Sequence, residues 1–387
     1  MPRVAVIGDG QLARMMHTEA IELGLQPRVL AGSPDASAAQ VFGDVQIGDY
    51  TNFDDLHATI QGASAITFDH EHVPNEFLQR LLDEGYNVEP RPQALIYAQD
   101  KLEQRTKLKE LGAPVPPFAK FDSVEDAREF WKLVDGRVCV KATRGGYDGH
   151  GVWFPETLQE CEQLVADLLE KGVVLYAEEK VQFARELSAM VARNRDGEVK
   201  AWPVAESRQA DGVCHIAIAP APELPTAVAK QCRDLATEIA ATLDVTGVLA
   251  VELFECIKED GASEILVNEL AMRPHNTGHW TQDGCVTSQF EQHLRAVLNW
   301  PLGSVDILEP VTVMVNTLGA EEDPQMPMEQ RVIEVMRRYP EAKVHLYGKS
   351  WRPGRKMGHV NVTGYDAMST LAIAQHAAHF IVHANWY

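Results

Sequence analysis

The six cysteines of this sequence form no regular framework. No Cys-x-x-Cys pair occurs, and the neighbouring residues are mostly apolar, at positions 139, 161, 214, 232, 256 and 285. Such scattered cysteines are typical of reduced, buried thiols and give no support to a disulfide scaffold.

Long hydrophobic runs are also missing. No apolar stretch reaches the ~18 residues that a transmembrane helix needs. The N-terminus enters a short strand at Val4 without the apolar core of a signal peptide. We therefore expect a cytoplasmic protein that does not act on a membrane.

Positive charge is scarce as well. The chain has 35 Lys and Arg against 56 Asp and Glu, a formal net charge of −21. This imbalance disfavours nonspecific binding to nucleic acid or to an anionic membrane surface. An anionic substrate would therefore need a local basic cluster.

Neither an internal repeat nor a low-complexity linker divides the 387 residues, of which 45% are hydrophobic. At ~150 residues per domain, this length predicts two or three domains with ample cores. We expect them to pack firmly, because no flexible tether separates them.

The common phosphate-binding motif of nucleotide-binding proteins, the Walker A loop, is absent. Instead, the segment 141–151 places four glycines in seven positions directly after the β-branched run Val138–Val140. Glycine backbone can approach a polyanion closely, and Lys141 and Arg144 add positive charge for phosphate oxygens. A hairpin turn is the alternative interpretation, and a hairpin lid over a nucleotide would satisfy both.

The first hundred residues predict a small parallel α/β sheet, with strands at 4–7, 27–30 and 65–68 and helices ending near 23 and spanning 76–84. Gly8-x-Gly10-x-x-Ala13 matches a loose dinucleotide fingerprint, but no acid closes the second strand after Leu30. We expect this loop to hold a single phosphate. A plain packing turn is the alternative.

Polar residues follow the third strand, as Asp69-His70-Glu71-His72. Open α/β sheets bind ligands at this edge, which favours substrate contact or simple solvation. A metal site is disfavoured, because a strand-like alternation would send neighbouring side chains to opposite faces.

Two apolar segments in the middle of the chain carry acids. Glu252 lies in Val248–Phe254, and Asn268-Glu269 lie in Ile265–Leu270. Carboxylates at matching positions of paired strands can bind Mg²⁺ together with nucleotide phosphates. A salt bridge is the alternative, but buried acids need a partner or a metal, which favours the metal.

Three further segments have candidate roles. A helix is expected over Leu95–Leu111. The strand 173–177 runs into Glu178-Glu179-Lys180-Val181, which predicts an adenine and ribose site or, alternatively, a charged edge strand. The loop Arg273–Thr281 is rich in Arg, His and Asn, which favours a small oxyanion site over an ordinary surface loop.

Four motifs together resemble the ATP-grasp superfamily and, within it, the family of N5-carboxyaminoimidazole ribonucleotide synthases, over essentially the whole chain. They are Gly8-Asp9-Gly10-Gln11-Leu12-Ala13-Arg14-Met15, Arg144-Gly145-Gly146-Tyr147-Asp148-Gly149, Asn268-Glu269-Leu270-Ala271 with His275-Asn276-Thr277-Gly278-His279-Trp280-Thr281, and Arg352-Pro353-Gly354-Arg355-Lys356-Met357-Gly358-His359. The last two blocks are the most specific to this family.

The resemblance implies an α/β (α+β) ATP-grasp fold. A Rossmann-like domain would span 1–98, the ATP-grasp domain 99–300, and a small β-rich C-terminal domain 301–387, with strands near 311–315, 342–347 and 359–362. The implied reaction phosphorylates bicarbonate with ATP and Mg²⁺ to carboxyphosphate, then carboxylates aminoimidazole ribonucleotide. No biotin is implied, and the family is commonly dimeric, so a homodimer is expected.

The resemblance also implies roles for individual residues. The ATP contacts would be Lys101, Lys141, the lid residues Gly145, Gly146, Tyr147, Asp148, Gly149, His150 and Gly151, the adenine and ribose residues Glu178, Glu179, Lys180, Val181 and Glu186, and the pair Asn268 and Glu269. Mg²⁺ would bind Glu252 and Glu269. Arg273, His275, Asn276 and His279 would border the bicarbonate and carboxyphosphate pocket. The ribonucleotide contacts would be Gln11, Leu12, Glu71, Arg352, Arg355 and Lys356.

The sequence departs from the family pattern at three places. His150 stands where Lys or Arg is common, Asp69–Pro74 replaces Glu-x-Glu-Asn-Val-Pro, and Gln209 stands in a segment where an Asn-x-His pattern is usual. Alternatives to the carboxylase are a formate-dependent ribonucleotide transformylase, a non-catalytic nucleotide-binding subunit and a nicotinamide oxidoreductase. The intact Glu252 and Glu269 and the missing acid after Leu30 argue against the last two.

Overall fold

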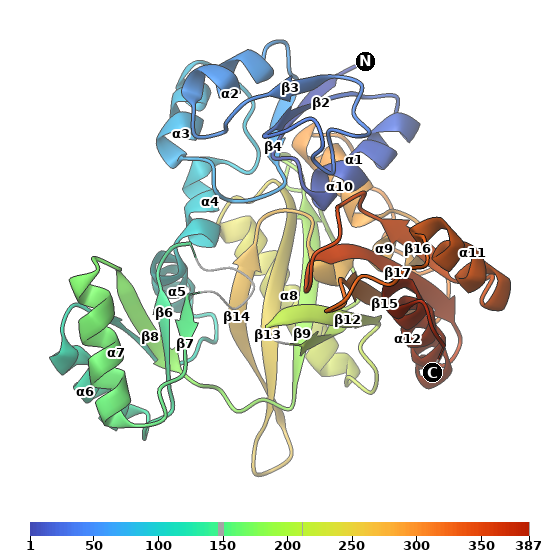
Figure 1. Ribbon diagram of the computed structural model, residues 1–387. Helices are drawn as coiled ribbons and strands as arrows, with labels where there is room; N and C mark the ends of the chain where they lie inside the picture. The colour runs from blue at the N-terminus through green and yellow to red at the C-terminus, as the bar shows by residue number, and fades with distance from the viewer. Residues whose placement is uncertain (146–150, 211, 387) are drawn as a thin grey trace.

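The computed structural model describes residues 1–145, 151–210 and 212–386. Within these residues it forms a four-stranded N-terminal sheet, a second four-stranded sheet and a nine-stranded central sheet. Figure 1 shows the N-terminal sheet above the central sheet and the second small sheet beside it, with the C-terminal elements on the opposite side.

The N-terminal unit is the parallel α/β sheet that the sequence predicts. Its elements are β1 (Arg3–Ile7), α1 (Gln11–Glu22), β2 (Gln26–Ala31), β3 (Val45–Ile47), α2 (Phe53–Thr59), β4 (Ala65–Phe68) and α3 (Asn75–Asp83). The strand order is β3-β2-β1-β4, and every pair is parallel. The carboxyl ends of β1 and β4 therefore lie side by side at one edge.

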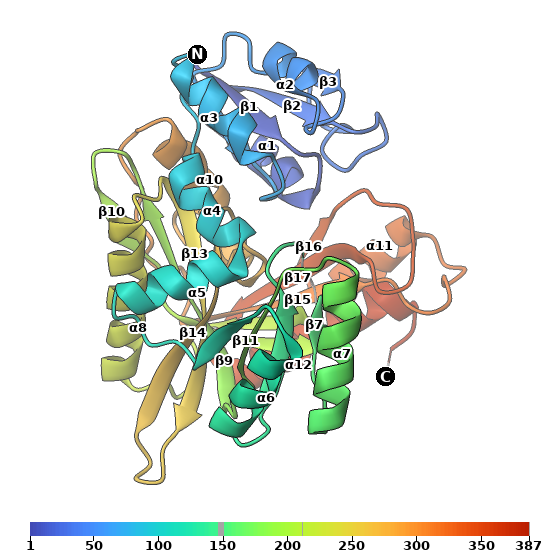
Figure 2. The same cartoon turned by 90° about the vertical axis from the view of Figure 1, so that its left-hand side faces the viewer.

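The prediction of a single helix over Leu95–Leu111 is wrong. The chain forms α4 (Pro92–Gln99) and α5 (Lys101–Glu110), and Asp100 between them is extended, with φ −122° and ψ 111°. Its carboxylate accepts the backbone N–H groups of Leu102 and Glu103, each at 3.1 Å, and so caps α5. Figure 2 shows α4 and α5 leading from the N-terminal unit toward the small sheet.

The small sheet has the order β5-β8-β6-β7 and carries two helices. Its elements are β5 (Phe118–Phe121), α6 (Val124–Leu133), β6 (Val138–Ala142), β7 (Val152–Trp153), α7 (Leu158–Glu170) and β8 (Leu175–Glu179). β6 and β7 pair antiparallel on either side of the glycine-rich loop. β8 lies between β5 and β6, so the interpretation of residues 178–181 as a charged edge strand is wrong.

The central sheet has the order β14-β13-β9-β11-β12-β15-β17-β16, with β10 paired to β9. Its strands are β9 (Arg185–Arg193), β10 (Val199–Ala201), β11 (Ala205–Ala210), β12 (Val213–Ala219), β13 (Gly247–Ile257), β14 (Ser263–Ala271), β15 (Val311–Leu318), β16 (Lys343–Leu346) and β17 (Lys356–Gly364). The helices around it are α8 (Thr226–Thr242), the 3-10 turn η1 (Asn276–Gly278), α9 (Thr281–Gly284), α10 (Gln289–Val297), α11 (Met328–Arg338) and α12 (Ala367–His383).

The C-terminal strands continue this central sheet instead of forming one of their own. β12 pairs antiparallel with β15, from Ile216 opposite Val315 to Ala219 opposite Thr312. β17, which begins at Lys356, follows β15 in the sheet. This pairing places Lys356–His359, the end of the C-terminal motif, in the same sheet as the acids of β13 and β14.

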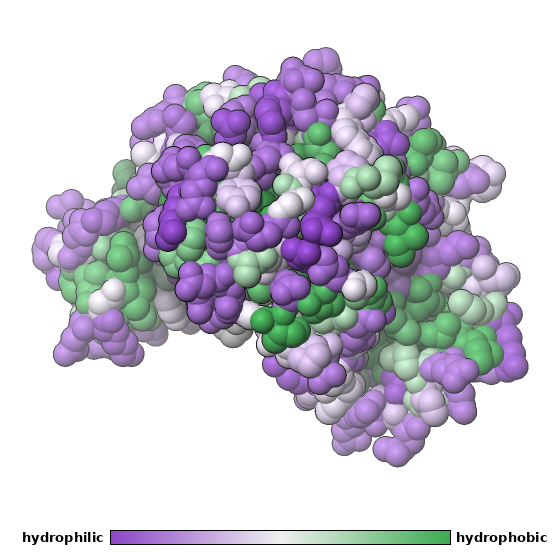
Figure 3. All heavy atoms as spheres, turned by 90° about the horizontal axis from the view of Figure 1, so that it is seen from above, coloured by the Kyte–Doolittle hydropathy of each residue, from purple (hydrophilic) through white to green (hydrophobic). Residues whose placement is uncertain are grey.

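Seen from above, hydrophilic side chains cover most of this face, and hydrophobic side chains gather in smaller groups among them (Figure 3). Among the residues that the structure describes, no helix is both long and apolar enough to cross a membrane.

Candidate active site

A cavity of about 1140 Å³ lies where the three sheets meet. The predicted site residues that the structure describes line this cavity, with three exceptions: Gly151, Arg352 and Arg355. The lid residues from Gly146 to His150 lie outside the described residues. Segments more than 300 residues apart in sequence, such as Gln11 and Lys356, therefore share one cavity.

The acids of the central sheet face each other. Glu252 on β13 is paired directly with Glu269 on β14, as the sequence predicts. Asn268 is the extra residue of a β-bulge, because Leu253 pairs next with Val267. A bulge interrupts the normal alternation of side chains, so the neighbours Asn268 and Glu269 both line the cavity.

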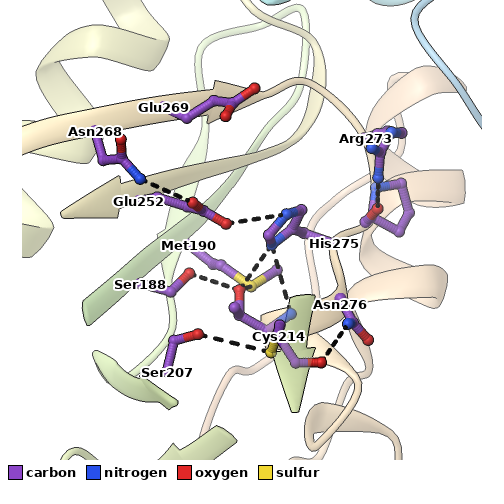
Figure 4. Close-up of polar contacts among 12 residues, drawn as sticks. Ser188, Met190, Ser207, Cys214, Glu252, Asn268, Glu269, Arg273, His275 and Asn276 are labelled. Carbon is purple, nitrogen blue, oxygen red and sulfur yellow. Dashed lines mark hydrogen bonds and ion pairs between the residues drawn. The ribbon is translucent and has the colours of Figure 1, made fainter. Parts of the chain in front are cut away.

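Each of these acids has a polar partner (Figure 4). Asn268 donates to Glu252 at 3.3 Å, and the Nε2 atom of His275 lies 3.4 Å from the other oxygen of Glu252. Lys101 donates to Glu269 at 2.5 Å. Burial, together with the charges of Glu269 and Glu186, raises the pKa of Glu252. Burial alone would also raise the pKa of Glu269, but Lys101 outweighs it and lowers that pKa.

This electrostatic arrangement fits a divalent cation. The raised pKa of Glu252 shows that Glu252 and Glu269, which face each other, have too little positive charge nearby for both to ionise easily. Among the described residues, no three His, Cys, Asp or Glu side chains form a metal-binding group. Two carboxylates are nevertheless enough where nucleotide phosphates and water complete the coordination of Mg²⁺.

The cavity wall formed by β6 and β8 contains a buried ion cluster. Glu178, which is 3% exposed, accepts a hydrogen bond from Nε of Arg105 at 2.8 Å and another from Lys141. Burial would raise the pKa of Glu178, but these two cations lower it to about 2. Glu178 thus holds Lys141 in place. Glu186 lies farther along the wall, and burial raises its pKa to about 7.

Arg105 is a structural residue that the sequence did not reveal. It is 1% exposed and also donates to the backbone oxygen of Asn268, so it joins α5, β8 and β14. In the sequence it is one of several charges on an otherwise polar helix, and no local pattern distinguishes it from Lys107 or Lys109.

The loop after β14 supplies the cations and imidazoles of the predicted oxyanion site. Arg273 forms an ion pair with Glu71, with 2.8 Å between the nitrogen and the oxygen. Burial, with Arg273 nearby, lowers the pKa of His275 to about 3, so its ring is neutral. Nδ1 of His275 lies 2.9 Å from the hydroxyl oxygen of Thr277, and Nε2 faces Glu252. Asn276 donates to the backbone oxygen of Cys214 at 3.4 Å (Figure 4).

The segment after β4 differs from the prediction. Asp69, His70, Glu71 and His72 all line the cavity, although alternation predicted opposite faces. The segment lies beyond the end of β4 and forms bends, so strand alternation does not apply. Gln209, on β11, also lines the cavity.

The N-terminal glycine loop is partly occupied by the chain itself. Asp69 accepts the backbone N–H of Gly10 at 2.5 Å. A Cβ atom at Gly8 would lie 2.3 Å from this carboxylate, and one at Gly10 would lie 2.6 Å from it. Both glycines are therefore explained by close packing, the alternative interpretation, and the amide of Gly10 is not free for a phosphate.

The positive charge beside this loop comes partly from a residue that the sequence analysis missed. Lys349 donates to Gln11 at 2.5 Å. Burial, with Arg355 and Lys356 nearby, lowers the pKa of Lys349 to about 8. Arg355 instead donates to Ser350 and does not line the cavity. The basic cluster that the net charge requires therefore includes Lys356, which lines the cavity, and Lys349, which contacts the lining residue Gln11. The nearby Arg352-Pro353-Gly354-Arg355 turn could have drawn attention to Lys349, three residues before it.

Comparison with known proteins agrees with this geometry. Residues 1–99 match the model of the ribonucleotide synthetase preATP-grasp domain, 106–290 that of the ATP-grasp domain, and 312–372 that of the phosphoribosylaminoimidazole carboxylase C-terminal domain. The N5-carboxyaminoimidazole ribonucleotide synthase of Corynebacterium ammoniagenes is 59% identical over 386 residues, which cover 100% of this chain and 93% of that protein.

Solved structures are similar along the whole chain. The synthetase of Thermus thermophilus superposes with a TM-score of 0.86 at 35% identity, covering 99% of both chains. The synthase of Aspergillus clavatus, in complex with ADP and 5-aminoimidazole ribonucleotide, superposes with a TM-score of 0.86 at 28% identity, covering 98% of both chains. The cavity thus lies in a fold that binds both ligands in a relative, and the chain belongs to the N5-carboxyaminoimidazole ribonucleotide synthase family of ATP-grasp ligases.

Proposed function

We propose that this chain uses ATP and bicarbonate to carboxylate the exocyclic amine of 5-aminoimidazole ribonucleotide in purine biosynthesis, releasing ADP and phosphate. The observation that carries the proposal is the convergence, in one cavity, of the Glu252–Glu269 pair, Lys141 and the Arg273–His279 loop. Family membership supports the same reaction.

The ATP end of the site would lie between β8 and β14. Lys141 and Lys101 lie at the cavity wall with their ammonium groups on Glu178 and Glu269, where they can turn to phosphate oxygens. Glu179, Lys180 and Val181 would meet adenine, and Glu186 the ribose. The glycine-rich lid, including Gly145 and Gly151, would close over the phosphates.

We propose that Glu252 and Glu269 hold Mg²⁺, with Asn268 orienting Glu252. Bound there, the ion would neutralise charge on the transferred phosphoryl group. The contact with Lys101 supports the assignment, because it lowers the pKa of Glu269 and so keeps this carboxylate ionised for a cation.

The carboxylation then follows in two balanced steps. An oxygen of bicarbonate forms a bond to the γ-phosphorus while the bond to ADP breaks, which yields carboxyphosphate and ADP. The amine of the ribonucleotide next bonds to the carboxyl carbon, phosphate leaves, and the amine loses one proton. Arg273, His275, Asn276 and His279 would stabilise the oxyanion in both steps.

The ribonucleotide would bind at the N-terminal end of the cavity. Gln11, Leu12 and Glu71 line this end together with Lys356. Lys349, through its contact with Gln11, adds a phosphate-binding group that we include in the proposal. Arg352 and Arg355 stay predicted ribonucleotide contacts.

The wider predictions are a homodimer in the cytoplasm that binds small molecules and neither nucleic acid nor membranes. We also propose domains at 1–98, 99–300 and 301–387. The ranges matched by the three domain models support these boundaries.

One assay tests the proposed reaction. ADP release is measured with and without aminoimidazole ribonucleotide at controlled bicarbonate, and it should require both. ADP release that depends on formate and not on bicarbonate would instead identify the transformylase alternative.

The phosphate assignment makes a separate prediction. Lys349→Met should raise the KM for the ribonucleotide on the order of 10-fold or more, because a charge-assisted contact to phosphate contributes about 1.5–3 kcal/mol. The KM for ATP should change little. Arg355→Met is the matched comparison and should have the smaller effect, since Arg355 donates to Ser350, whereas Lys349 donates to Gln11 on the cavity wall. A larger effect at Arg355 would show that the ribonucleotide phosphate binds at the outer basic residues.

A further inference from the structure

Gln289 is a fully buried glutamine that hydrogen-bonds both histidines of the loop Arg273–Thr281. It begins α10 and is 0% exposed. Its Oε1 atom accepts the backbone N–H of His275 at 2.8 Å. Its Nε2 atom donates to the backbone oxygen of His275 and to Nδ1 of His279, each at 2.9 Å.

The orientation of this amide follows from its neighbours. The backbone N–H of His275 can only donate, so the side-chain atom facing it must be the oxygen of Gln289. The NH₂ group must then face the backbone oxygen of His275 and the ring of His279. The neighbouring groups therefore determine which amide atom of Gln289 is the oxygen and which is the nitrogen.

The tautomer of His279 follows in turn. An amide NH₂ only donates, so Nδ1 of His279 must accept and cannot carry the ring proton. Burial, with His275 and Lys356 nearby, holds the pKa of His279 well below its ordinary value, so the ring is neutral. Its single proton is therefore on Nε2.

Packing fixes the plane of the same ring. Phe290 stacks on it with 5.7 Å between ring centroids, and His359 lies at 4.9 Å. His359 is itself held by the hydroxyl of Tyr347 at 2.7 Å. His279 also lines the cavity of the proposed oxyanion site, and its imidazole has a defined plane and tautomer.

We propose that Gln289 is a positioning residue for the carboxylation: it holds His279 as the neutral Nε2–H tautomer, which donates a hydrogen bond to the oxyanion of bicarbonate or carboxyphosphate. This inference rests on the proposed function for the identity of the oxyanion. The tautomer itself does not depend on it.

The chain contains a matched control on the same helix. Gln292 is also 0% exposed on α10. It forms the same pair of hydrogen bonds with a loop: Nε2 donates to the backbone oxygen of Gly303 at 2.8 Å, and Oε1 accepts the backbone N–H of Gly303 at 2.7 Å. These two hydrogen bonds stabilise a loop without involving a histidine ring.

Gln289→Glu and Gln292→Glu therefore test the inference together. Both variants bury an acid and place a carboxylate oxygen against a backbone carbonyl, so their losses of stability should be similar. Only Gln289→Glu presents an acceptor to Nδ1 of His279 and thereby moves the proton onto Nδ1. Removal of an oxyanion donor costs about 10²–10³ in rate, so we expect a loss of this order in kcat/KM for bicarbonate. The KM for ATP should stay within about twofold, as expected for a group that does not touch the nucleotide.

The pH profile separates positioning from structural damage. In Gln289→Glu, a carboxylate beside the imidazole should raise the pKa of His279 and introduce a new ionisation into kcat/KM between about pH 6 and 8. Gln292→Glu should keep the profile of the unmodified enzyme. Equal kinetic losses in the two variants, with an unchanged profile in both, would overturn the inference.

A measurement on the unmodified enzyme does not depend on variant folding. Nitrogen-15 NMR of histidine-labelled protein at pH 7, with the signal of His279 assigned by its loss in His279→Gln, reports which ring nitrogen is protonated. We expect protonation at Nε2. Protonation at Nδ1, or at both nitrogens, would overturn the inference. The Nε2 tautomer without bicarbonate-dependent ADP release would retain the positioning role and contradict the proposed function instead.

Discussion

Glu269→Ala is expected to abolish ATP turnover, with a loss on the order of 10³-fold or more, because a metal ligand at a phosphoryl group contributes several kcal/mol to the transition state. Glu269 faces Glu252 across paired strands and is held by Lys101. Its removal leaves Glu252 as the one carboxylate of the pair for the cation and takes away the hydrogen-bond acceptor of Lys101. The measurement is bicarbonate-dependent ADP release, with calorimetric titration of ATP and Mg²⁺ as an independent readout of binding.

Glu264→Ala is the matched control for this prediction. Glu264 lies on the same strand, but its side chain is 45% exposed and it pairs at the surface with Lys258. Exposed ion pairs contribute little, so activity and stability should stay close to those of the unmodified enzyme. Near-normal turnover in Glu269→Ala, with the control equally active, would refute the metal assignment.

Arg105→Met should have the largest effect on stability, lowering the free energy of unfolding by about 3–5 kcal/mol, the usual cost of removing one partner from a buried ion pair. Arg105 is 1% exposed, and its loss leaves the buried Glu178 with Lys141 as its remaining cation. Urea unfolding at pH 7 is the measurement. Lys107→Met on the same helix removes an exposed i,i+3 pair with Glu110 and should change stability by less than about 0.5 kcal/mol.

The pH dependence of this stability has a definite sign. The ion cluster lowers the pKa of Glu178 from 4.5 to about 2, so the native state favours the ionised carboxylate. The resulting stabilisation is complete above pH 4.5 and is lost as the pH falls toward 2. The difference in stability between Arg105→Met and the unmodified protein should therefore shrink over this range. A difference that is constant with pH would show that Arg105 stabilises the fold by packing alone.

Local patterns of the sequence were enough for the parallel N-terminal sheet, the β6–β7 pairing around the glycine loop, and the two acids on paired strands. Each depends on residues close together in the chain, such as the apolar runs 4–7 and 248–254, whose periodicity reports the element directly. The motifs at both ends of the chain were enough to identify the family.

The tertiary structure decided the features that depend on distant partners. Asp100 interrupts a continuous helical pattern: it caps α5 and also forms an ion pair with Arg144, which lies in the loop after β6. Asp69 uses the amide of Gly10, which explains two glycines that the sequence associates with a ligand.

The sequence by itself thus determined the family, the reaction class and the strands that carry the acids, since these follow from local periodicity and specific motifs. Only the tertiary structure decided which groups meet: the bulge that turns Asn268 toward the cavity, the burial of Arg105 and the contact of Lys349 with Gln11. The physical reason is that each of these depends on a hydrogen bond or a packing contact between segments separated by up to 338 residues, for which no local pattern exists.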